Sequence, residues 1–128
     1  MPVIAAASTG QVRYAATLAL RVGQVPTYRG VTQPTMSQQQ FRQVKNQLTQ
    51  QIGQAVIKHP NAPVAPHQQQ LLQSMAALSG VAIGTPANRQ QADNWAIAWF
   101  KANQAKVPNL ITHIALTIGN GAAIPPAA

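Results

Sequence analysis

Amide and cationic side chains, rather than acids, supply most of the chemistry of this sequence. The segment SQQQFRQVKNQLTQQIGQAVIKH (37–59) contains three Lys or Arg residues, many Gln residues and no carboxylate. If the segment is helical, one flank presents Arg42, Lys45, Asn46, Thr49 and Gly53. Amides donate hydrogen bonds to phosphate and sugar oxygens without adding charge, and a glycine lets another backbone approach closely. The pattern predicts a helix that follows the backbone of a nucleic acid without reading its sequence.

A simply solvated, Gln-rich face is the alternative explanation of this helix. A solvated face gains solubility from Glu, yet the chain of 128 residues has one acid, Asp93, against nine Lys and Arg. The net charge is +8, and charged residues make up only 8% of the chain, against roughly 25% in ordinary domains. Cations spaced singly along a chain suit a periodic polyanion. We therefore favour non-specific binding to a nucleic acid, DNA or RNA, with log affinity falling against log salt at a slope of about −4 per subunit.

The inventory of titratable residues argues against catalysis. General acid–base chemistry needs paired carboxylates or an oriented His, and Asp93 is the only acid. Asp93 follows Arg89 by four residues, which predicts a local ion pair on a helix. His59, His67 and His113 have no metal-ligand spacing, there is no Cys, and no Gly-rich phosphate loop is present. We expect no catalytic site, no metal and no cofactor.

Four helices are predicted after residue 36, each marked by a capping residue or Pro at its start. Their expected ranges are 37–59, with Ser37 and Gln40 as a capping box; 66–79, ending at Gly80; 86–106, with Thr85 as the cap; and 109–118, ending at Gly119. The third of these helices is apolar over more than half its circumference, so part of it is expected to meet another subunit through Trp95, Trp99 and Phe100.

The first 36 residues have a different character. Pro26, Gly30 and Pro34 prevent a regular helix over 24–36. Residues 11–22 alternate apolar and other residues with a period of two, which favours a strand, but their Ala and Leu content favours a helix, and the pattern leaves both open. The predicted fold is all-α, with an extended basic N-terminal arm (1–36), a compact helical domain of about four short helices (37–121) and a C-terminal tail (122–128).

The order and composition of these parts resemble those of a viral family. The arm QVRYAATLALRVGQVPTYRG (11–30), the helix SQQQFRQVKNQLTQQIGQ (37–54) and the terminal segment VPNLITHIALTIGNGAAIPP (107–126) carry the likeness. In layout, the whole chain resembles the major capsid proteins of filamentous and rod-shaped archaeal viruses, the rudivirus, lipothrixvirus and tristromavirus group.

The resemblance implies a virion protein, made in the host cytoplasm, that coats linear double-stranded DNA in a helical filament. It implies A-form DNA and a coat dimer, either of one chain or of two paralogous chains, and it leaves open a lipid envelope. The residues expected at the phosphates are Arg13, Arg21 and Arg29 in the arm and Arg42, Lys45, Asn46 and Thr49 in the next helix.

Two other functions fit the same sequence. A basic accessory or structural subunit of a large organellar or ribonucleoprotein assembly would use the acid-poor N-terminus for targeting or docking. A basic coat protein of a phage or plant virus would differ in geometry and in the nucleic acid that it binds.

Overall fold

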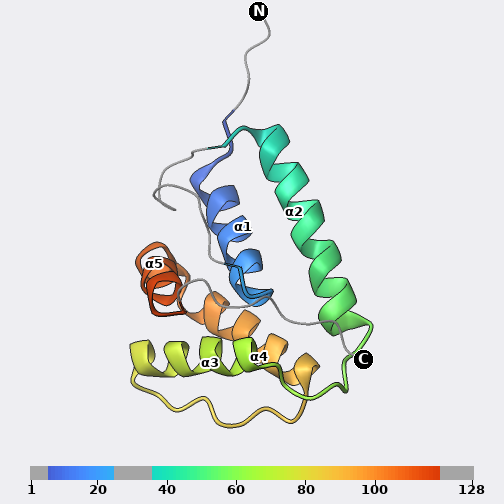
Figure 1. Cartoon of the computed structure of the whole chain (residues 1–128). Helices are drawn as coiled ribbons and strands as arrows, with labels where there is room; N and C mark the ends of the chain where they lie inside the picture. The colour runs from blue at the N-terminus through green and yellow to red at the C-terminus, as the bar shows by residue number, and fades with distance from the viewer. Residues whose placement is uncertain (1–5, 25–35, 119–128) are drawn as a thin grey trace, which may run out of the picture.

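The computed structural model of the chain describes residues 6–24 and 36–118, and these residues form an all-α fold, as predicted (Figure 1). The elements in chain order are α1 (Thr9–Arg21), α2 (Gln38–Ile52), a π-helical turn η1 (Gly53–Ile57), α3 (Pro66–Ser79), α4 (Arg89–Ala102), a 3-10 turn η2 (Gln104–Lys106) and α5 (Val107–Ile118). The predicted tail, 122–128, lies outside the described residues.

Helices α1 and α2 lie side by side and begin at the same end of the molecule (Figure 1). Each begins with a capping box, in which the Ser and the Gln three residues later satisfy each other's backbone N–H groups: Ser8 with Gln11, and Ser37 with Gln40. The Ala7 N–H donates to the Met36 carbonyl at 3.0 Å, which joins the two helix starts. The two helices therefore run parallel from a common end.

Residues 11–22, which the sequence leaves open between strand and helix, form a helix as far as Arg21, and the prediction that residues 1–36 are an arm separate from the helical domain is wrong for residues 6–24. Helix α1 is part of the core, and its Val12, Ala15 and Ala16 side chains have no solvent exposure. Small Ala side chains let α1 pack closely against several neighbours at once, and Ala is the strongest helix former. The period-two pattern failed because a helix buried on most of its circumference has no single polar stripe. The part of the arm at 25–35, which includes Arg29, lies outside the described residues.

Helices α3 and α4 pack together across the C-terminal ends of α1 and α2, and α5 lies beside α1 on the side away from α2 (Figure 1). Helix α3 begins at Pro66 as predicted and ends at Gly80, which has φ +72°. Helix α4 begins later than predicted, because Asn88 rather than Thr85 caps it by accepting from the Gln91 N–H at 2.9 Å. It also ends earlier, at Ala102, and the 3-10 turn separates it from α5.

Part of the apolar circumference of α4 is covered by the chain's own helices. Trp99 and Phe100, predicted at a subunit interface, are 8% and 7% exposed and meet edge to face with ring centroids 5.7 Å apart. They belong to the main core together with Ile111 and Ile114 of α5. Burial within one chain thus replaces the predicted subunit contact for both rings. Trp95 is half-buried, and its assignment to an interface stays a prediction.

Candidate nucleic-acid interface

Helix α2 presents its cationic flank to solvent, as predicted. Its inward face consists of Phe41, Leu48 and Ile52, which are buried against the rest of the molecule. Arg42 and Lys45 are exposed on the flank. Because the inward residues are seven and four positions apart, they share one face of the helix, and Arg42 and Lys45 point away from the core.

Two polar residues on this flank differ in what they can offer. Asn46 is exposed, so its amide is available to donate. Thr49 is also exposed, but its hydroxyl already donates to the Lys45 carbonyl at 2.7 Å. The Thr49 oxygen keeps only acceptor capacity in this conformation, so Thr49 is a poor donor to phosphate.

The flank ends at Gly53, where α2 passes into the π-helical turn. A methyl group built on Gly53 would meet no other atom of the described chain within 4 Å. The backbone there is therefore open to close approach from outside. Lys58, just beyond the turn, is exposed and adds a cation to the same end of α2.

Arg21, which the sequence assigns to phosphate binding, is engaged inside the molecule. Its Nε donates to Asp93 Oδ1 at 2.8 Å and its Nη2 donates to Oδ2 at 2.6 Å. The two side chains are 16% and 6% exposed. A bidentate pair of this kind uses the guanidinium fork that a phosphate would need. Arg21 therefore holds α1 against α4 and is not available to bind phosphate.

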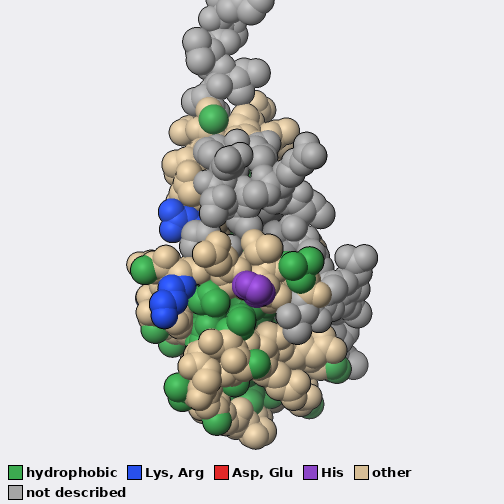
Figure 2. Space-filling model, turned by 90° about the vertical axis from the view of Figure 1, so that its left-hand side faces the viewer, with side chains coloured by type: hydrophobic (Ala, Val, Ile, Leu, Met, Phe, Trp, Pro, Cys, Tyr) green, Lys and Arg blue, Asp and Glu red, His purple; other side chains and the backbone are tan. Residues whose placement is uncertain are grey.

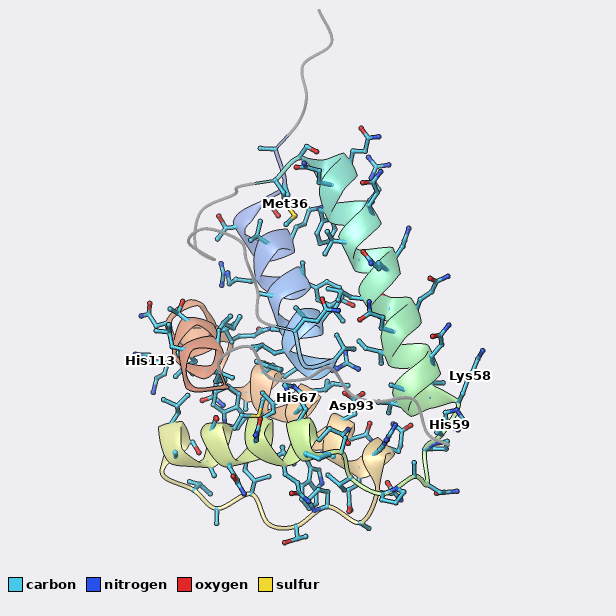
Figure 3. The ribbon with its side chains drawn as sticks, viewed as in Figure 1. Met36, Lys58, His59, His67, Asp93 and His113 are labelled. Atoms are coloured by element: carbon cyan, nitrogen blue, oxygen red, sulfur yellow. The ribbon has the colours of Figure 1, made fainter. Side chains whose placement is uncertain are left out.

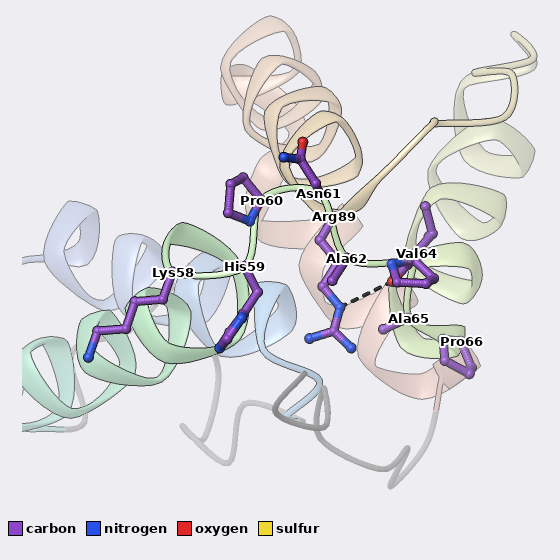
Figure 4. Close-up of a pocket in the computed structure, with 10 residues that line it drawn as sticks. Lys58, His59, Pro60, Asn61, Ala62, Val64, Ala65, Pro66 and Arg89 are labelled. Atoms are coloured by element: carbon purple, nitrogen blue, oxygen red, sulfur yellow. Dashed lines mark hydrogen bonds between the residues drawn. The ribbon is translucent and has the colours of Figure 1, made fainter. Parts of the chain in front are cut away.

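Arg89, the partner expected for Asp93, supports a neighbouring loop. It is 6% exposed; its Nε donates to the Pro63 carbonyl at 3.1 Å (Figure 4) and its Nη1 to the Ala55 carbonyl at 3.0 Å. Ala55 lies in the turn that ends α2, where a helix carries partial negative charge. A buried guanidinium at that position donates hydrogen bonds to carbonyl groups, and its positive charge interacts favourably with the helix dipole.

His67 is a buried residue whose environment the sequence did not predict. It is 4% exposed, and its Nε2–H donates to the Leu20 carbonyl near the end of α1. Its Nδ1 is buried without a partner. Burial lowers the pKa of His67, and the bond to Leu20 opposes this only in part. The neutral imidazole thus links α3 to the end of α1 (Figure 3).

Arg13 is the arm residue that keeps its charge unpaired within the described part of the chain. It faces a groove between α1 and α4, away from the α2 flank, and its Nε is shielded without a hydrogen-bond partner. The structure therefore divides the predicted phosphate ligands: Arg42, Lys45 and Asn46 share one flank, Arg13 lies elsewhere, and Arg21 is paired.

No group of three or more His, Cys, Asp or Glu residues within 6–24 and 36–118 could hold a metal ion. Within the same ranges, no helix is long and apolar enough to cross a bilayer. Compared with protein-family models, curated proteins and solved structures, the chain gives no match.

Proposed function

We propose that the protein is a structural coat protein that covers double-stranded DNA without sequence preference, as the major capsid subunit of a helical virion. The DNA backbone lies along the flank of α2. Arg42 and Lys45 neutralise phosphates, the Asn46 amide donates to phosphate or sugar oxygens, and Gly53 lets the backbone come close.

One observation carries this proposal: the only acidic side chain of the sequence is engaged in a buried ion pair. Asp93 is 5% exposed and paired with Arg21, and the sequence has no other acid. The exposed cations lie on several elements: Arg42, Lys45, Lys58, Lys101 and Lys106. A surface without any acidic side chain repels phosphate nowhere, and its field draws a polyanion from long range.

The distribution of the cations supports coating rather than sequence readout. Specific readers place Arg, Asn or Gln in a groove where they meet base edges. Here Arg42 and Lys45 extend from a helix flank, and Lys101 and Lys106 extend from α4 and η2. Cations that extend from separate elements can neutralise a polymer that is surrounded by many copies of the protein. In more detail, we propose that the coated DNA is held in A-form within a helical filament.

Nuclease protection tests the proposal directly. Purified protein is mixed at low salt with linear duplexes of random and of defined sequence, and digestion is followed as the salt concentration rises. We expect equal protection of all duplexes and a steep loss with salt, since about four phosphate contacts per subunit give a slope of about −4. Absence of protection at low salt, or protection of one sequence only, would overturn it. Electron micrographs of the protected material should show filaments of uniform width.

A further inference from the structure

A groove between α1 and α4 combines free positive charge with an apolar lining. Its volume is about 500 Å³, within the roughly 300–1,000 Å³ of small-molecule sites. The lining residues from α1 are Gly10, Arg13, Tyr14, Thr17 and Arg21, and those from α4 and beyond are Ile97, Phe100, Lys101, Gln104 and Val107. On the face that Figure 2 shows, cationic side chains border apolar ones and no acidic side chain is visible among the described residues.

The charge of this groove is uncompensated. Arg21 is neutralised by Asp93, but Arg13 and the exposed Lys101 have no ion pair within the described residues. The Arg13 Nε is shielded from solvent and lacks an acceptor. An unmet buried donor costs free energy, so an anionic oxygen at this guanidinium would be favoured by both charge and hydrogen bonding.

The rest of the lining favours a hydrocarbon chain over a polar ring. Ile97, Phe100 and Val107 are apolar, and Tyr14 is 50% exposed at the edge. The Thr17 hydroxyl already donates to the Tyr14 carbonyl at 2.7 Å, so it has no proton left to donate. A polar ring buried here would lose hydrogen bonds to water with few replacements.

The sequence excludes one obvious occupant, an acidic side chain of a second copy. Asp93 is the only Asp or Glu, and it is buried in its pair with Arg21. No acidic side chain of this chain or of a second copy is therefore available to the groove.

Two other hollows lack this combination. The larger, about 680 Å³, is formed by the loop after α2 and by Arg89, but Arg89 Nε and Nη1 are bonded to carbonyls and Lys58 extends away from it (Figure 4). A third, about 360 Å³ and next to Leu72 and Ile83, has no charged side chain in its lining.

We propose that the groove between α1 and α4 binds a single-chain amphipathic anion, a carboxylate or phosphate monoester on an alkyl chain. The head contacts Arg13 and Lys101, and the chain lies over Ile97, Phe100 and Val107. This site is separate from the DNA-binding flank of α2, so it stands or falls independently of the proposed function.

Calorimetric titration of the full chain tests the site with five probes, the alkyl ones kept below the concentration at which they self-associate: decanoate, decyl phosphate, decanol, inorganic phosphate and adenosine monophosphate. Saturable one-to-one binding of both decyl anions, with much weaker binding of decanol and of inorganic phosphate, is expected. The two anions distinguish a fatty-acid-like ligand from a phosphate-headed lipid by which one binds more tightly. Adenosine monophosphate is the fifth probe, and tighter binding of it than of decyl phosphate would overturn the apolar assignment.

Matched variants locate the site. Arg13→Gln should weaken binding of the decyl anions at least about tenfold, and Lys101→Gln, at an exposed position, about twofold to threefold. Arg42→Gln removes the same charge from α2, outside the groove, and should leave the affinity for the decyl anions unchanged. Equal affinity in the Arg13→Gln variant, or a loss in Arg42→Gln as large as in Arg13→Gln, would refute the site. Duplex binding by Arg13→Gln, measured in parallel, shows whether the DNA proposal survives separately.

Discussion

The outer flank of α2 and the contact between α1 and α4 use the same kinds of side chain in opposite ways. On α2, Arg42 and Lys45 are exposed, and no acid lies anywhere on that helix. Between α1 and α4, Arg21 and Asp93 form a shielded bidentate pair. Exposed charge on the first surface is available to a partner, whereas the charge of Arg21 at the second is already satisfied by Asp93.

This difference shows that the role of each arginine depends on whether its position on the helix faces the core or the solvent. The sequence spaces its arginines singly, which made Arg21 and Arg42 look alike. Position 21 lies at the end of a helix buried among the others, where an unpaired charge would be costly. The single acid of the chain is used at that point.

Removing the acid should have the largest effect. In Asp93→Ala, Arg21 would be left without its carboxylate in a mostly buried position, which should lower the free energy of unfolding by about 3 kcal/mol, at the low end for a broken buried pair because Arg21 retains some exposure. Urea denaturation measures this. Arg42→Ala on α2 is the control and should change stability by less than about 0.5 kcal/mol. Equal effects of the two variants would erase the distinction between the regions.

Acid pH should lower the free energy of unfolding through His67, which belongs to the buried contacts between the helices. The unfolded imidazole takes up a proton near its ordinary pKa of 6.5, while the lowered pKa keeps the folded imidazole neutral. The unfolded state therefore binds more protons, and stability falls as pH drops below about 6.5. Denaturation midpoints at pH 7.5 and 5.0 should differ less in His67→Gln than in the parent chain. His113→Gln, at an exposed position of α5, should leave the contribution of His67 in place; an unchanged pH dependence in His67→Gln would refute the assignment.

A smaller effect is expected at Gly53, where folding and binding should respond in opposite directions. Gly53→Ala should stabilise the helix by up to about 1 kcal/mol, because Ala is the better helix former and its methyl group meets nothing. If DNA approaches the backbone there, the same methyl group should weaken duplex binding a few-fold. Thermal melting and fluorescence anisotropy separate the two. A variant that is both more stable and unimpaired in binding would place the DNA away from Gly53.

Local signals predicted much of the helical framework. Ser37 with Gln40 marks the start of α2, and Pro66 with Gly80 marks both ends of α3, each within a residue or two. The predicted end of α2 at His59 was too late, because the helix passes at Gly53 into a π-helical turn. The same kind of signal, Ser8 with Gln11, precedes α1 and would have identified that helix had it been weighed against the period-two pattern.

Long-range contacts could not be predicted in this way. Arg21 and Asp93 are 72 residues apart in the chain, and only the packing of α1 on α4 brings them together. The same packing forms the groove at Arg13, and the packing of α3 on α1 buries His67 against Leu20. The flank of α2 was predictable because it belongs to one helix, where spacing alone determines which residues share a face.

The most direct test of the central claim, that the α2 flank carries the DNA, is the salt dependence of duplex binding. The slope of log affinity against log salt is measured for the parent chain, for Arg42→Gln/Lys45→Gln and for the charge-preserving Arg42→Lys/Lys45→Arg. Each lost phosphate contact reduces the slope by about 0.9, so the first variant should be shallower by about 2 and the second unchanged. The same slope in all three proteins would show that the phosphates lie elsewhere and would contradict the account.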